Sequence, residues 1–129
     1  MIILDTHVWL WWLMGDVRLK AQWRQCIETS DRVCVSAISC VEVAWLAESG
    51  RIILPSASDE WMENAIVNSG LELIPITPHI AKLAAGFTQH HRDPQDRLII
   101  ATALAYQATL ISADTKFPLY TELDSLLLN

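Results

Sequence analysis

Basic residues are scarce in this chain, which has 9 Lys and Arg against 15 Asp and Glu and a formal net charge of −6. This balance excludes a protein whose whole surface attracts nucleic acid, because such a surface needs an excess of cations. Any contact with nucleic acid must therefore be local, and it must depend on a bound metal ion.

Cysteine and glycine are also few. The three cysteines have neither the C-x-x-C spacing of a metal knuckle nor the even number of a disulfide framework, so we expect free thiols in a reducing cytoplasm. None of the 4 glycines belongs to a glycine-rich phosphate loop. The serines lack the G-x-S-x-G elbow and a Ser-His-Asp pattern, which argues against a serine nucleophile.

Long apolar runs are missing as well, although 52% of the residues are hydrophobic. No stretch approaches the roughly 18 uncharged apolar residues that a membrane span requires. Asp5 interrupts the apolar N-terminus, so we expect no signal peptide and a cytoplasmic location. The length of 129 residues predicts a single domain over residues 1–129 that buries its own core.

Short apolar segments alternate with helical ones along the chain. Strands are predicted at 1–5, 32–37, 71–76 and 108–114. We expect a brief helical turn at 7–15, then helices at 16–29 (capped by Asp16), 39–50, 58–68, from Thr77 onward, and 98–107. An edge strand is predicted around residues 118–120. This alternation predicts an α/β fold, a three-layer α/β/α sandwich with a central, mostly parallel sheet of four to five strands.

Four acidic residues fall where such a sheet brings them to one edge. Asp5 and Asp114 close predicted strands, and Glu42 and Asp96 lie near the starts of helices at the same edge. Four carboxylates this close would raise each other's pKa and oppose folding unless a cation neutralised them. Oxygen ligands suit Mg²⁺ or Mn²⁺, and such an ion can activate a water for attack on a phosphodiester.

Helix capping offers a simpler explanation for each acid taken alone. Asp5 could cap the turn that follows it, and Ser39 with Glu42 has the spacing of a capping box. Asp93 suits a helix cap better than a metal ligand, and Asp96 fits either role. No cap explains why all four acids reach one edge, so the set favours a metal site.

Basic residues gather near two of these acids in the sequence. They are His90, His91, Arg92, Arg97 and Lys116. Such a rim could hold phosphates in an otherwise acidic protein, and it is equally consistent with a solvated loop.

Tryptophan is frequent, with 6 residues in the chain. Trp9 and Trp12 lie one helical turn apart, which predicts core packing. Because aromatic residues are also common at interfaces, the apolar first third is a candidate surface for self-association or for a partner.

Four segments, in order and over nearly the whole chain, resemble the PIN-domain nucleases, in particular the VapC-type toxins of bacterial toxin–antitoxin pairs. They are LDTHVWLW, SAISCVEVAWL, HRDPQDRLIIATAL and LISADTKF. The resemblance implies a Mg²⁺- or Mn²⁺-dependent ribonuclease, a homodimer, and a VapB-like antitoxin that inhibits the site. It also implies that the metal-site acids are Asp5, Glu42, Asp96 and Asp114, with Asp93 as a weaker candidate and Thr6 as a supporting hydroxyl.

We therefore expect a metal-dependent endoribonuclease. Asp5, Asp96 and Asp114 would hold one or two ions, and Glu42 would orient the attacking water or a second ion. One alternative is a phosphohydrolase of the haloacid dehalogenase kind, which needs a second acid where this chain has His7. Another is a non-catalytic interaction module whose acids bind a structural cation.

Overall fold

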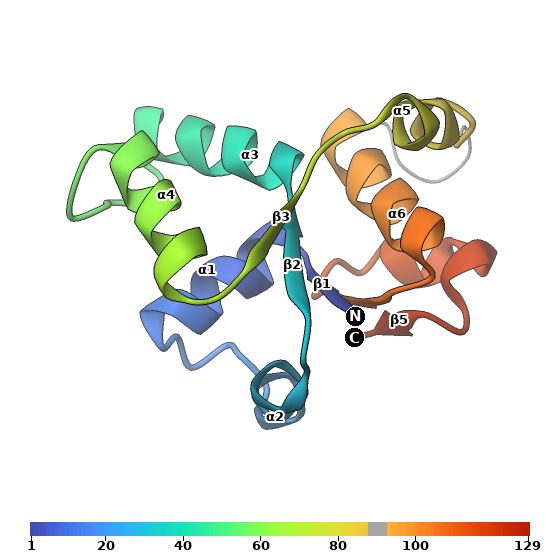
Figure 1. Ribbon diagram of the computed structural model, residues 1–129, viewed down its shortest axis with the longest axis horizontal. Coiled ribbons are helices and arrows are strands. Elements are labelled where there is room, and N and C mark those ends of the chain that lie inside the picture. The colour runs from blue at the N-terminus through green and yellow to red at the C-terminus, as the bar shows by residue number, and fades with distance from the viewer. Residues whose placement is uncertain (88–92) are drawn as a thin grey trace.

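A five-stranded, fully parallel sheet forms the centre of the computed structural model, which describes residues 1–87 and 93–129 (Figure 1). The strand order is β3-β2-β1-β4-β5. The strands are β1 (Ile2–Leu4), β2 (Val33–Ser36), β3 (Glu72–Ile74), β4 (Thr109–Ile111) and β5 (Leu127–Leu128). This topology confirms the predicted α/β sandwich and places every strand's carboxyl end at one edge.

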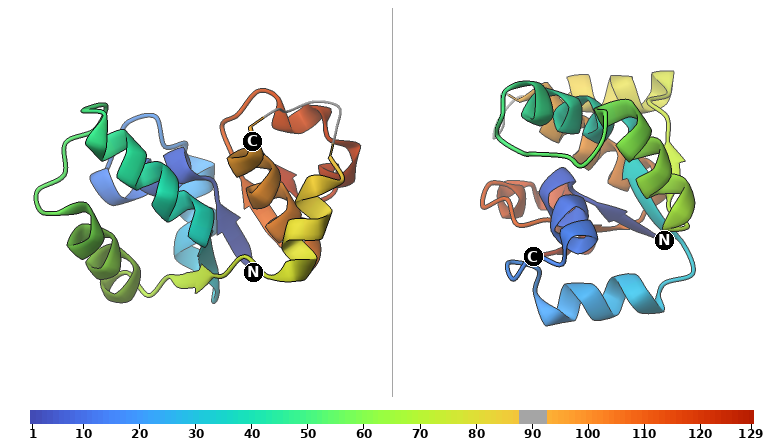
Figure 2. Two further views of the ribbon diagram at one scale, coloured as in Figure 1. Left: turned by 90° about the horizontal axis from the view of Figure 1, so that it is seen from above. Right: turned by 90° about the vertical axis from the view of Figure 1, so that its left-hand side faces the viewer.

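Helices cover both faces of the sheet (Figures 1 and 2). One face carries α1 (Thr6–Met14), α2 (Ala21–Thr29), α3 (Ala37–Glu48) and α4 (Ser58–Asn68). The other carries α5 (Pro78–Ala85), α6 (Pro94–Tyr106) and the 3₁₀ turns η1 (Phe117–Leu119) and η2 (Thr121–Leu123). None of the helices in the described part of the chain is both long and apolar enough to cross a membrane.

The central strand shows why the apolar runs are continuous. Ile2 and Leu4 pack into the core beneath α1 to α4, whereas Ile3 packs into the core beneath α5 and α6. Because both faces of a parallel sheet are covered, neither set of side chains can be polar. Trp9 and Trp23 are almost fully buried in the first of these cores, which confirms core packing for Trp9.

Three sequence predictions about helix starts were wrong. The brief turn predicted at 7–15 is a regular helix over Thr6–Met14, followed by the cap Gly15, whose φ of 63° suits a glycine. Helix α2 begins only at Ala21, because Asp16 forms its own turn, accepting a hydrogen bond from the Arg18 backbone N–H at 2.9 Å. Asp16 also forms a 2.8 Å ion pair with the Arg18 side chain.

The third wrong prediction is the capping box. Helix α3 starts at Ala37, and its cap is Ser36, which accepts a hydrogen bond from the Ile38 backbone N–H at 3.2 Å. Ser39 and Glu42 therefore lie inside the helix. Glu42 is too far from the helix start for its side chain to reach the backbone of the cap residue. The capping explanation for Glu42 is thereby removed.

The predicted edge strand at residues 118–120 is also wrong. These residues lie in and just after the turn η1, and the fifth strand is Leu127–Leu128, which pairs with Leu110 and Ile111 of β4. Two residues are too few to leave a periodic signal, so this strand depends on its partner rather than on its own sequence.

Candidate active site

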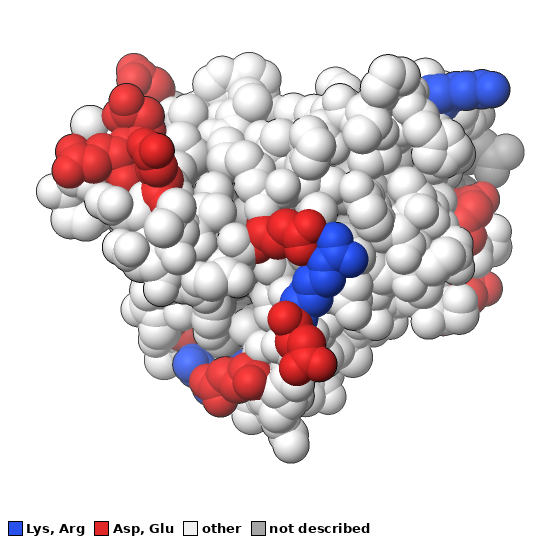
Figure 3. All heavy atoms as spheres, in the orientation of Figure 1, with Lys and Arg blue, Asp and Glu red and all other residues white. Residues whose placement is uncertain are grey.

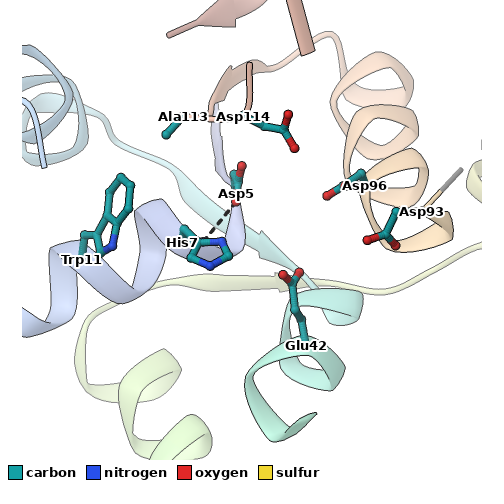
Figure 4. A pocket seen from close by; sticks show the side chains of 8 residues that line it. All are labelled: Asp5, His7, Trp11, Glu42, Asp93, Asp96, Ala113 and Asp114. Carbon is teal, nitrogen blue, oxygen red and sulfur yellow. Dashed lines mark hydrogen bonds between the residues drawn. The ribbon is translucent and has the colours of Figure 1, made fainter. Parts of the chain in front are cut away.

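A cleft of about 370 Å³ opens at the carboxyl ends of the central strands (Figure 4). The residues that line it are Asp5, His7, Trp11, Glu42, Asp93, Asp96, Ala113 and Asp114. All four acids singled out in the sequence thus face one cavity, together with Asp93. In Figure 4 their side chains approach from α3, α6, the end of β1 and the turn after β4.

Asp5 is the most buried of these acids, with 7% of its surface exposed. It follows β1 and caps α1, where one carboxylate oxygen accepts a hydrogen bond from the His7 backbone N–H at 3.0 Å. The other oxygen accepts a hydrogen bond from the Ser112 hydroxyl. Burial raises the pKa of Asp5, and these two hydrogen bonds oppose the rise.

Ser112 is a site residue that sequence analysis did not assign. It is fully buried, donates to Asp5, and accepts a hydrogen bond from the Asp114 backbone N–H at 3.0 Å. One hydroxyl therefore links two acids of the cleft. The sheet register explains this contact, because Leu4 pairs with Ile111, which sets the next residues, Asp5 and Ser112, side by side.

Glu42 is positioned by a second pair of hydroxyls. Thr6 Oγ1 lies 2.9 Å from Glu42 Oε1 and 2.9 Å from Ser39 Oγ, and both hydroxyl residues are fully buried. A hydroxyl has one proton and the carboxylate can only accept, so Thr6 donates to Glu42 and Ser39 donates to Thr6. Burial is the main cause that raises the pKa of Glu42, and the Thr6 hydrogen bond lowers it.

Helix α6 contributes two acids in different ways. Asp93 caps the helix, accepting a hydrogen bond from the Gln95 backbone N–H at 2.9 Å, as predicted, and it also lines the cleft. Asp96 lies in the first turn, and its pKa is raised to about 8. Burial is the largest cause of this rise, followed by the charge of Asp93 and then those of the other cleft acids.

Asp114 follows β4 and accepts a hydrogen bond from the Lys116 backbone N–H at 2.8 Å. Among the described residues that line the cleft there is no Lys or Arg, so Lys116 and Arg97 lie outside its wall. Arg92, His90 and His91 fall outside the described residues. The predicted phosphate-binding rim therefore stays a prediction.

The acidic side chains that line the cleft fit a hard divalent cation, because they offer carboxylate oxygens, the ligands that such ions prefer. Over residues 1–87 and 93–129, no three His, Cys, Asp or Glu side chains already stand close enough to chelate a single ion. Metal binding would therefore require some of these side chains to rotate toward the middle of the cleft. Burial is the largest cause of the raised pKa of Asp96, and repulsion by the neighbouring carboxylates, which a cation would relieve, adds to it.

Charge is sparse on one further face of the molecule. On the face shown in Figure 3, the basic and acidic side chains form small groups separated by wide uncharged regions. Ion pairs join Arg18 with Asp16 and Arg32 with Glu72.

The fold and the cleft together define an α/β domain with an acidic site at the carboxyl ends of its parallel strands. The chain belongs to the PIN domain family, whose match spans residues 2–123. It is 36% identical over 116 residues to Ribonuclease VapC22 of Mycobacterium tuberculosis, covering 89% of this chain and 88% of that protein. Family membership sets aside the haloacid dehalogenase alternative.

Solved structures share the same fold. The VapBC2 structure from Rickettsia felis, bound to a DNA fragment from its promoter, has a TM-score of 0.72 at 18% identity and covers 100% of this chain and 98% of its own. FitAcB from Neisseria gonorrhoeae has a TM-score of 0.66 at 19% identity, covering 100% of this chain and 97% of its own. At such low identity these likenesses establish the fold.

Proposed function

We propose that this protein is an endoribonuclease that uses Mg²⁺ or Mn²⁺, and that it is the toxin of a VapBC-type toxin–antitoxin pair. The observation that carries the proposal is the gathering of five carboxylates in one cleft of a PIN fold. The 36% identity to a VapC ribonuclease supports RNA as the substrate. An RNA substrate also favours a cytoplasmic protein.

In this proposal Asp5, Asp96 and Asp114 hold the ion, with Asp93 at the margin of the site. When bound, the ion supplies positive charge beside the scissile phosphate and lowers the pKa of an attacking water. One carboxylate directly follows β1, one lies in the first turn of α6 and one lies in the turn after β4, so the sheet edge sets their spacing.

The surrounding hydroxyls hold two of the acids in place. Ser112 and the His7 N–H fix the two oxygens of Asp5, so that this carboxylate cannot turn away from the cleft. Thr6 holds Glu42 by one oxygen, leaving the other to accept a hydrogen bond from water. Glu42 would thereby orient the water for attack.

The partner surface is proposed to lie on the α1 and α4 side of the molecule. A hollow of about 500 Å³ there includes Leu13, Met14, Ile53 and Trp61 in its lining, and Ile53 is 91% exposed. A VapB-like antitoxin could place an amphipathic segment in it. Trp45, 60% exposed on α3, is a candidate contact for a homodimer.

Cleavage of RNA by the purified protein, with and without Mn²⁺, tests the function. We expect Mn²⁺-dependent cleavage by the wild type and a loss on the order of a hundredfold or more in Asp96→Asn. Glu60→Gln is a matched control, because Glu60 is an exposed acid in the first turn of α4. Stabilisation by Mn²⁺ with no cleavage of RNA would instead support the non-catalytic metal-binding module.

A further inference from the structure

A buried serine of α3, Ser39, lies behind the hydroxyl that holds Glu42. Ser39 Oγ is 2.9 Å from Thr6 Oγ1, which in turn is 2.9 Å from Glu42 Oε1. Both hydroxyl residues are fully buried, whereas Glu42 lines the acidic cleft (Figure 4). The three side chains therefore form a hydrogen-bonded chain that runs from the interior of the protein to the wall of the cleft.

The protons along this chain have one consistent direction. Thr6 has a single hydroxyl proton, and oxygens of Glu42 and Ser39 both lie within reach of it. The carboxylate can only accept, so Ser39 donates to Thr6 and the Thr6 proton goes to Glu42. Hydrogen bonds in such a series strengthen one another. Ser39 thus favours the arrangement in which Thr6 holds Glu42.

The Ser39 hydroxyl is directed away from its own helix. A serine or threonine inside a helix commonly donates to the carbonyl four residues earlier, which bends or weakens the helix slightly. Thr102 of α6, also buried, does so, with its hydroxyl 2.7 Å from the carbonyl oxygen of Leu98. Ser39 instead contacts a side chain of α1, 33 positions away in the sequence.

Packing alone does not call for a hydroxyl at this position. Val43 lies one turn further along the same face of α3 and is fully buried and apolar. A buried hydrogen bond adds little to stability, and an apolar group of similar shape can replace it at little cost when both partners are changed. The contact that the Ser39 hydroxyl makes is therefore best explained by the residue at the end of the chain, Glu42.

We propose that Ser39 is a positioning residue for RNA cleavage, acting on Glu42 through Thr6. By directing the Thr6 proton to Glu42 Oε1, it holds the carboxylate in one orientation and leaves the other oxygen for the attacking water. This inference rests on the proposed ribonuclease function and adds to it a residue that lines no part of the cleft. Because the chain acts on the water, turnover depends on Ser39 and the binding of RNA does not.

A double-mutant cycle on RNA cleavage with Mn²⁺ separates this role from a structural one. Ser39→Ala should lower kcat by about fivefold, which corresponds to one ordinary hydrogen bond, and leave KM unchanged. In Thr6→Val the same change should have no further effect on kcat, whereas in Thr6→Ser, which keeps the hydroxyl, it should have its full effect. Thr102→Val removes a buried hydroxyl remote from Glu42 and, as the matched control, should leave kcat unchanged.

Crystal structures of wild type and Ser39→Ala give a second readout that needs no activity. We expect a single Glu42 orientation held by Thr6 in wild type and more than one orientation in Ser39→Ala. An unchanged kcat in Ser39→Ala, an equal loss of kcat with and without the Thr6 hydroxyl, or a single Glu42 orientation in both structures would each overturn the inference and leave the ribonuclease function intact. A wild-type protein that cleaves no RNA would remove both.

Discussion

Replacing Asp96 by Asn measures what it costs to bury a charged carboxylate among the other acids of the cleft. The pKa of Asp96 is raised from 3.8 to about 8, so its ionised form is strongly disfavoured in the folded protein. Each pKa unit is worth about 1.4 kcal/mol, which gives an upper limit of about 4 kcal/mol at pH 7. Water screens a partly exposed side chain, and we therefore expect the metal-free variant to be more stable than wild type by about 2 kcal/mol at that pH.

The sign of the pH dependence follows from the same shift. Because the folded pKa of Asp96 lies above its unfolded value, the folded state binds the proton more tightly. Its contribution to stability is therefore full below about pH 4 and is lost as the pH rises toward about 8. Asn cannot titrate, so the advantage of Asp96→Asn should grow over this range.

Urea denaturation in the presence of a chelator, between about pH 4 and about pH 8, measures this difference. Glu60→Gln serves again as the control and should follow the wild type at every pH. The reasoning is refuted if wild type and Asp96→Asn differ in stability by the same amount throughout the range. Adding Mn²⁺ at a hundredfold excess over its Kd should raise the stability of wild type by about 2.7 kcal/mol and that of the variant by much less.

Other substitutions probe the groups around this acid. Asp93→Asn should change neither stability nor RNA cleavage appreciably, because Asn caps a helix about as well as Asp. Asp93→Ala should lose about 1 kcal/mol of stability with its helix cap and keep most of its cleavage activity. Loss of cleavage in both variants would make Asp93 a metal ligand. Thr6→Val leaves Glu42 without its hydroxyl donor and should cost about 1 to 3 kcal/mol in chemical denaturation, and an unchanged stability would contradict the hydrogen bond. Sedimentation at micromolar concentration should show a dimer that Trp45→Glu weakens, and a wild-type monomer would remove the homodimer proposal.

Local signals in the sequence predicted some of the helix starts correctly. Asp93 followed by proline marks a helix start, and the cap forms there as expected. The start of α3 was misplaced because Ser36 and Ser39 are both good caps, and only the length of β2 decides between them. Such a choice depends on packing against the sheet, which a local pattern does not contain.

Contacts between distant residues were beyond the reach of the sequence. The hydrogen bond from Ser112 to Asp5 joins residues 107 positions apart and requires the register of β1 with β4. The contact between Thr6 and Glu42 likewise requires α1 to pack beside α3. Asp5, Asp96 and Asp114 could be predicted because each follows a strand or opens a helix, whereas Glu42 lies inside α3. Of the supporting hydroxyls, only Thr6 was expected, and only through the family resemblance.

The central claim is that the cleft carboxylates hold a divalent ion, and a crystal structure of the protein with Mn²⁺ tests it most directly. Anomalous scattering identifies the manganese position independently of the protein atoms. We predict a peak in the cleft with oxygens of Asp5, Asp96 and Asp114 at roughly 2.0 to 2.2 Å, a distance typical of such small divalent ions. A peak elsewhere, or none in crystals of active protein grown at saturating Mn²⁺, would contradict the account.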